Sequence, residues 1–260
     1  QMATINTASH FGLERELGSI APGRRADMIL TGDLVSLPIE VVYARGNKVA
    51  EDGKLTIDCP HYKWPNTSKN TVHLGKVLAQ TDFEIPAPTK ALSADLPVVN
   101  GLVEPNKDIC QIALVERHRG TGAVTNAFVS GFGYHGTMAI ASTVAHDSHH
   151  MIVVGTDRVM MAAAANRLGA IGGGVTVWKD GYEIGVVELP IAGLMSDRPA
   201  AEVAAAAQTI LQAMQACGCS LNNAFMQHSL LALVVIPELR LSDLGLVDVA
   251  KFAITDLICL

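Results

Sequence analysis

The stretch IASTVAHDSHHMIVV at residues 140–154 places three histidines, an aspartate and a serine between two largely apolar runs. The runs, Ile140–Ala145 and Met151–Val154, are short and rich in β-branched residues. That pattern predicts two paired β-strands with His146–His150 as the loop of a hairpin. Polar groups at this density are costly to bury without partners, and they are also what a metal or proton-transfer site requires.

The elements expected around this hairpin indicate an α/β fold class, in the mixed α+β sense. Asp157 is a favourable N-cap for a helix over 158–168, which Gly169 ends. The sequence Ser196-Asp197-Arg198-Pro199 begins a second helix that runs to about Ala216. Strands are expected at 110–116, 123–129, 175–178 and 182–189, one or two buried strands at 225–236, and a final helix at 247–257.

The first part of the chain has a different pattern. Residues 1–14 are expected to be the end of a helix, and 15–60 a small β element with short strands at 26–30, 39–45 and 48–50. Prolines concentrate between residues 60 and 97, which indicates a linker or a wrapping segment. We therefore expect three parts: a helix end at 1–14, a β segment with its linker at 15–90, and an α/β domain at 91–260.

Composition and charge argue against several classes of function. The net charge is −6 and no basic run interleaves with aromatic residues, which disfavours binding to nucleic acid. The longest uninterrupted apolar run, Leu230–Ile236, is too short to cross a membrane. The five cysteines are odd in number and scattered among apolar neighbours, so we expect reduced thiols in a cytoplasmic protein.

The residues of the histidine cluster leave two interpretations open. In the first, two of the groups in the stretch His146–His150 face a pocket at the end of the sheet. There they would act as metal ligands or as donors and acceptors to a polar substrate. In the second, Asp147 and Ser148 satisfy the backbone of a turn and the histidines are solvated.

Two other polar stretches are of interest in the sequence. Gly131 and Gly133 belong to a Gly-x-Gly-x-x-Gly run, but bulky residues within it and the lack of a clear following helix disfavour a phosphate loop. We expect a mobile connection there and take both glycines as candidates for an active-site lid. Arg117 and Arg119 follow a predicted strand and are expected to be surface or interface charges.

Several stretches resemble one enzyme superfamily. Residues 3–8 (ATINTA) and 18–27 (GSIAPGRRAD) resemble the part of amidohydrolase-superfamily enzymes that follows the last barrel strand, where the chain returns to a small β-sandwich. Other stretches are similar to the C-terminal region of the bacterial adenine deaminase family. They are GFG at 131–133, AHDSH at 145–149, IGGG at 171–174, PIAGLMSD at 190–197 and IPEL at 236–239.

The resemblance implies a β-sandwich cap segment and an accessory α/β domain of an enzyme that hydrolyses adenine to hypoxanthine and ammonia. Two manganese or iron ions would activate a water molecule. The residues that hold these ions would lie in the barrel, which is expected to precede Gln1, so no metal ligand is assigned to this chain. His146, Asp147 and His149 match the family's His-Asp-Ser-His motif, and with Ser148 they are the candidates for binding substrate. The N-terminal barrel is the expected partner, in a homo-oligomeric enzyme of purine salvage.

Two other functions stay open. One is a structural and oligomerisation module with no catalytic residue, which the 49% hydrophobic content favours. The other is a free-standing metal-binding domain that uses His146, His149 and His150. The sequence identifies no hydrogen-bond partners that would orient the three rings, which disfavours this function.

Overall fold

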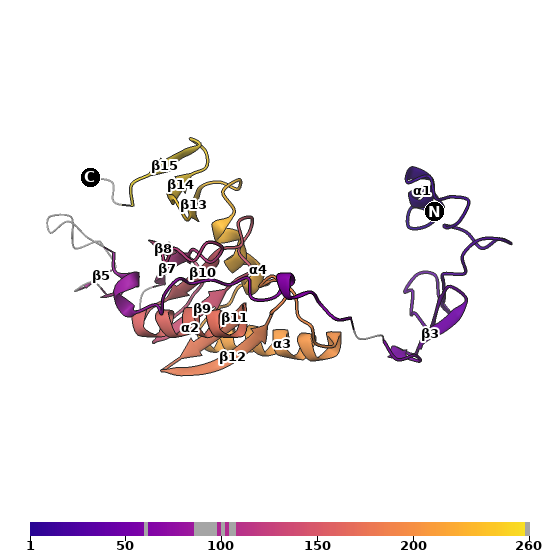
Figure 1. Ribbon diagram of the computed structural model, residues 1–260, viewed down its shortest axis with the longest axis horizontal. Helices are drawn as coiled ribbons and strands as arrows, with labels where there is room; N and C mark the ends of the chain where they lie inside the picture. Colours follow the sequence, from indigo (N-terminus) through magenta and orange to yellow (C-terminus); the bar gives the residue numbers. More distant parts are fainter. Residues whose placement is uncertain (60–61, 86–97, 100–101, 104–107, 258–260) are drawn as a thin grey trace. The chain divides into compact units, whose positions relative to one another are not determined.

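The chain forms two compact units. The computed structural model describes residues 1–59, 62–85, 98–99, 102–103 and 108–257. Their contacts define a first unit, Gln1–Lys63, and a second unit, Trp64–Leu260 (Figure 1). The domain boundary predicted near residue 90 lies outside the described residues and stays a prediction.

The first unit joins one short helix to a four-stranded antiparallel sheet. The helix is α1 (Ile5–His10), and the strands are β1 (Met28–Leu30), β2 (Val41–Ala44), β3 (Asn47–Glu51) and β4 (Lys54–Leu55), in the order β1-β2-β3-β4. These elements match the helix end and the short strands that the sequence predicts. Between β2 and β3, Arg45 and Gly46 have positive φ angles of 50° and 82°, which suit the tight turn of a hairpin.

The first unit leaves many large apolar side chains exposed. Ile20, Leu34 and Val35 are 85%, 83% and 93% exposed. A pocket of about 720 Å³ also opens between α1 and the strands β1 and β2. Apolar surface of this extent is typical of an interface rather than of a free surface.

The second unit is built on a six-stranded antiparallel sheet with the order β12-β11-β9-β10-β7-β8. Its central strands β9 (Met138–Ser142) and β10 (Met151–Gly155) are the predicted hairpin, with Ile152 opposite Ser142. The other strands lie almost where the sequence predicts them: β7 (Ile109–Val115), β8 (Val124–Ser130), β11 (Gly174–Lys179) and β12 (Tyr182–Glu188). A separate pair is formed by β5 (Val98–Val99) and β6 (Leu102–Val103).

Helices cover both faces of the six-stranded sheet. One face packs against α2 (Arg158–Ile171) and the 3-10 helix η2 (Gln80–Phe83), and the other against α3 (Ala200–Ala216) and α4 (Ala224–Ser229). Successive residues of a strand point to opposite faces, and both faces are covered, so every residue of the central strands β9 and β10 is buried. The mixture of helices and antiparallel sheets confirms the mixed α/β class. None of the helices in the described ranges has the length and apolar character needed to span a bilayer.

Local contacts determine where α2 begins and ends. Asp157 is its N-cap as predicted, with Oδ1 accepting a hydrogen bond from the Met160 N–H at 2.8 Å. The helix does not stop at Gly169, as predicted, but ends at Gly172, whose φ of 80° is left-handed. Gly169 lies against Leu74, since a Cβ atom there would lie 2.6 Å from Leu74 Cδ1. Its lack of a side chain thus allows close packing and does not end the helix.

The C-terminal tail differs from the prediction. Residues 225–236, predicted as buried strands, lie largely in α4 and the 3-10 helix η3 (Leu230–Ala232). The final helix predicted at 247–257 is replaced by a three-stranded sheet of β13 (Leu239–Ser242), β14 (Gly245–Asp248) and β15 (Ala253–Thr255). Both predictions were wrong. For residues 225–236 the reason is that a short apolar run does not distinguish a strand from a buried helix.

Candidate functional site

The loop between β9 and β10 contains the predicted substrate-site residues and lies at one end of the six-stranded sheet. The pairing of β10 with β7 places Met151 opposite Val115, the last residue of β7. The loop that follows β7, at residues 116–123, therefore lies next to it. Residues 143–150 are named the histidine loop below.

Backbone hydrogen bonds give the histidine loop a defined conformation. The His146 N–H donates to the carbonyl oxygen of Ser229, at the end of α4, at 3.0 Å. The His149 N–H donates to the carbonyl oxygen of Ala145 at 2.7 Å and closes a tight turn. Within that turn His149 has a left-handed φ of 52°.

The four predicted substrate-site residues differ in exposure. Asp147 and Ser148 are exposed, whereas His146 and His149 are half-buried with ring centroids 5.6 Å apart. Burial lowers the pKa of His149, and the proximity of His146 and of the Arg117 guanidinium lowers that pKa further. The Nδ1 atoms of both rings are buried and have no hydrogen-bond partner within the described residues. At neutral pH His149 is thus an uncharged imidazole, which offers one donor and one acceptor.

A second pair of imidazoles lies beside the first. The rings of His118 and His150 have centroids 4.8 Å apart, and His150 is buried. His150 Nε2 is 3.6 Å from Asp243 Oδ2, and burial lowers the pKa of His150 although the Asp243 charge opposes this shift. His118 Nε2 lies 2.7 Å from the carbonyl oxygen of Ser148. The predicted cluster therefore divides into His146 with His149, and His150 with a histidine from another loop.

Two charged residues after β7, Glu116 and Arg117, are buried, although the sequence pattern does not predict it. Arg117, predicted as a surface or interface charge, is 1% exposed, so that prediction was wrong; Arg119 is exposed as expected. The Glu116 carboxylate accepts hydrogen bonds from the N–H groups of Arg119 and Thr121 at 2.8 and 3.1 Å. Burial alone would raise the pKa of Glu116, but these bonds outweigh it and bring the pKa to about 2. The burial of β7 from Cys110 onwards continues through Glu116 and Arg117, although no residue type in the sequence marks this continuation.

The predicted lid glycines lie at the other end of the sheet. Gly131 and Gly133 follow β8, whose last residue Ser130 pairs with Ile109 at the start of β7. Their N–H groups donate to the carboxylate of Asp108 at 3.1 and 2.8 Å. The structure does not bring these glycines together with the histidine loop, and a lid formed by them stays a prediction.

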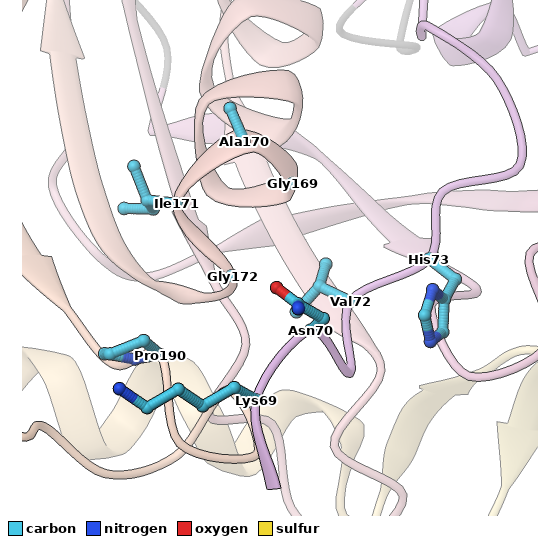
Figure 2. A pocket seen from close by; sticks show the side chains of 9 residues that line it. All are labelled: Lys69, Asn70, Val72, His73, Gly169, Ala170, Ile171, Gly172 and Pro190. Carbon is cyan, nitrogen blue, oxygen red and sulfur yellow. The ribbon is translucent and has the colours of Figure 1, made fainter. Parts of the chain in front are cut away.

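A small pocket of about 200 Å³ opens near the C-terminal end of α2. In Figure 2 the Asn70 amide lies close to Gly172, and the His73 imidazole points away from Gly172. Lys69, also in its wall, pairs with Asp197 at 2.9 Å. No predicted site residue lines this pocket, so it does not belong to the candidate site. Its lining consists of Lys69, Asn70, Val72, His73, Gly169, Ala170, Ile171, Gly172 and Pro190.

The side chains in the described ranges do not fit a metal centre. No group of three or more His, Cys, Asp or Glu side chains there is placed to hold a metal ion. The arrangement therefore gives no support to a metal-binding domain built on His146, His149 and His150. It also does not fit the two-ion centre that the resemblance implies.

Comparison with known protein families shows the family to which the chain belongs. Residues 87–253 match the family described as the adenine deaminase C-terminal domain, which is more than half of the chain. The chain belongs to the adenine deaminase family. Residues 1–49 also match the amidohydrolase family, in agreement with the resemblance of the first stretches.

Individual adenine deaminases align along nearly the whole chain. The adenine deaminase of Ruegeria pomeroyi is 68% identical over 280 residues, which cover 99% of this chain and 46% of the relative. That of Paracoccus denitrificans is 67% identical with the same coverage, and that of Moorella thermoacetica is 42% identical over 99% of this chain and 47% of the relative. The chain thus spans about half the length of the curated relatives it matches, and corresponds to their C-terminal portion.

Proposed function

We propose that this chain is the C-terminal part of an enzyme of purine salvage that hydrolyses adenine to hypoxanthine and ammonia. The observation that carries the proposal is the 68% identity to an adenine deaminase along 99% of the chain. Adenine-dependent release of ammonia by the full-length protein is the direct test. The 260-residue chain by itself is expected to release none.

We further propose that an N-terminal barrel of the same protein binds two manganese or iron ions. The match of residues 1–49 to the amidohydrolase family, which suggests a metal-dependent enzyme, supports this. The side chains of the described ranges form no ligand set of their own. Metal analysis should therefore find manganese or iron in the full-length enzyme and none in the 260-residue chain.

The proposed compartment is the cytoplasm, and the proposed assembly is a homo-oligomer. The four cysteines of the described ranges, Cys59, Cys110, Cys217 and Cys219, are free thiols, which supports a reducing compartment. Mass measurement of the native full-length enzyme tests the oligomer.

We propose that His146, Asp147, Ser148 and His149 contact adenine or close its site in the full enzyme. Adenine presents ring nitrogens that accept hydrogen bonds and an amine that donates them, so its site needs partners of both kinds. A neutral His149 imidazole, the Asp147 carboxylate and the Ser148 hydroxyl supply both kinds from one loop. The half-burial of the two rings adds support, because a hydrogen bond is stronger where water is partly excluded.

Replacement of His149 in the full-length enzyme tests this role. His149→Asn is the informative change, because asparagine tolerates the left-handed backbone at this position better than alanine does. For this variant and for His149→Ala, we expect kcat/KM for adenine to fall about a hundredfold, as on loss of a group that binds or transfers a proton. The melting temperature should change little.

The matched control is His73→Asn, which replaces an exposed imidazole outside the histidine loop. We expect this variant to keep the wild-type rate. If both His149 variants also kept that rate, the loop would have no part in the mechanism.

A purely structural role is the second candidate, and the exposed apolar surface of the first unit favours it. In this proposal Ile20, Leu34 and Val35 are covered by the barrel or by another subunit, and the chain does not touch adenine. Leu34→Ser with Val35→Ser should then weaken assembly. The two candidates differ in the His149 variants, which would keep the wild-type rate if the role were structural only.

A further inference from the structure

Two consecutive side chains of the loop after β7 contact two consecutive carbonyl groups of the histidine loop. Arg117 Nε donates to the carbonyl oxygen of His149 at 2.5 Å. His118 Nε2 lies 2.7 Å from the carbonyl oxygen of Ser148. The paired residues are 32 and 30 positions apart in the chain, so tertiary packing and not local turn geometry brings them together.

Arg117 also connects the histidine loop to two further segments. Its Nη1 donates to the carbonyl oxygen of Thr71 at 3.3 Å, and its Nη2 to that of Ala192 at 3.1 Å. Its own carbonyl oxygen accepts a hydrogen bond from the His73 N–H at 2.8 Å. A guanidinium suits this position because its five donors lie in one rigid plane and can reach several carbonyl groups at once.

Carbonyl groups, and not an ion pair, hold the buried guanidinium of Arg117. The Arg117 side chain is 1% exposed, and among the described residues the charge of the neighbouring Glu116 stabilises it without a hydrogen bond to the guanidinium. The neighbouring Glu116 carboxylate is already bonded to backbone N–H groups of its own loop. A buried charge that forms no ion pair loses its hydration; an apolar side chain would avoid that cost but would leave the three carbonyl oxygens without these donors. What arginine provides is the fixed geometry of the three carbonyl groups.

That geometry determines the backbone of His149. Its φ of 52° is a conformation that residues other than glycine adopt infrequently. The N–H of His149 is held by Ala145, and its carbonyl oxygen is held by Arg117. With both sides of the residue held, the direction in which its Cβ and imidazole leave the backbone is fixed.

We infer that Arg117, together with His118, positions the histidine loop so that the His149 imidazole points toward the substrate. This inference rests on the proposed role of the loop in the adenine site. Arg117 is buried and acts only through the residue that it holds. A displacement of about 1 Å in a positioned group can lower a rate as much as about a hundredfold, so loosening these contacts should be measurable.

The experiment is a double-mutant cycle in the full-length, metal-loaded enzyme. Arg117→Lys keeps the charge but loses the planar set of donors, and kcat/KM for adenine is expected to fall about tenfold. In the His149→Asn background the same change should lower kcat/KM no further, because the positioned group is gone. Arg119→Lys, an exposed residue of the same loop, is the matched control and should keep the rate of its parent in both backgrounds.

Equal falls in the two backgrounds would overturn the inference, because Arg117 would then act independently of His149. Should Arg117→Lys fail to fold, His118→Ala carries the same test, since that side chain is exposed and contacts the Ser148 carbonyl. In that case, a wild-type rate for His118→Ala would overturn the inference. A wild-type rate for His149→Asn alone would instead refute the proposed role of the loop, and the inference with it, so the two failures are distinguishable.

Discussion

The buried imidazole of His228 should make the second unit sensitive to acid. His228 lies in α4 and is 1% exposed, and neither of its ring nitrogens has a hydrogen-bond partner among the described residues. The ring packs edge-on against Phe132, with the centroids 6.2 Å apart. Burial lowers the pKa of His228 from 6.5 to about 4, because apolar surroundings disfavour the charged form.

The direction and size of the effect follow from this pKa. The unfolded chain binds a proton at His228 near pH 6.5 and the folded chain only near pH 4, so the free energy of unfolding decreases as the pH falls through this interval. At about 1.4 kcal/mol per pKa unit, the whole interval corresponds to about 3 kcal/mol, of which about 2 kcal/mol is lost between pH 7 and pH 5. His228→Leu removes the titrating group and its unpartnered nitrogens at similar volume, so this variant should be at least as stable at pH 7.

Urea unfolding followed by tryptophan fluorescence measures the difference. Both tryptophans, Trp64 and Trp178, belong to the second unit. Between pH 7 and pH 5 the wild type should lose about 2 kcal/mol more than His228→Leu does. His73→Leu, which removes an exposed imidazole of the same unit, is the control and should follow the wild type. If His228→Leu lost as much stability as the wild type, the burial of this imidazole would not be the cause and the reasoning would be refuted.

Two further predictions concern the contacts of α2. Asp157→Ala should lower the free energy of unfolding by about 1 kcal/mol, because the hydrogen bond from the Met160 N–H is lost. Asp157→Asn should retain most of this stability, and urea unfolding measures both variants. Asn166→Ala should release the segment around Leu78, whose N–H and carbonyl oxygen bond to the Asn166 amide at 2.9 and 2.8 Å, at a cost of about 1–3 kcal/mol. Hydrogen exchange at the Leu78 amide should become faster while β9 keeps its protection, and unchanged exchange would contradict the prediction.

The centre of the second unit could be predicted because its signals are local. The β9–β10 hairpin follows from two short apolar runs and a polar stretch between them, and the start of α2 follows from the cap at Asp157. The tail at 225–257 lacks such signals. Its apolar side chains, such as Leu241, are buried in the core that contains α3, and that packing decides between helix and strand.

The candidate site could be predicted in part for the same reason. The sequence places His146–His149 in a loop at the end of a strand pair, and the structure agrees. The separation of His150 from these residues depends on His118 and Asp243, which reach it from distant parts of the chain. Proximity of histidines in the sequence therefore overstated how many of them share one site.

The burial of Arg117 shows why part of a site leaves no trace in a motif. Its three acceptors are carbonyl oxygens that lie 32, 46 and 75 residues away in the chain. Every residue has a carbonyl group, so no residue type marks these partners, whereas an ion pair would require an acid. Because the acceptors belong to separate segments, the conformation of His149 depends on the folded second unit as a whole. A peptide that contained only residues 140–154 would have the histidines but not the contacts that direct them.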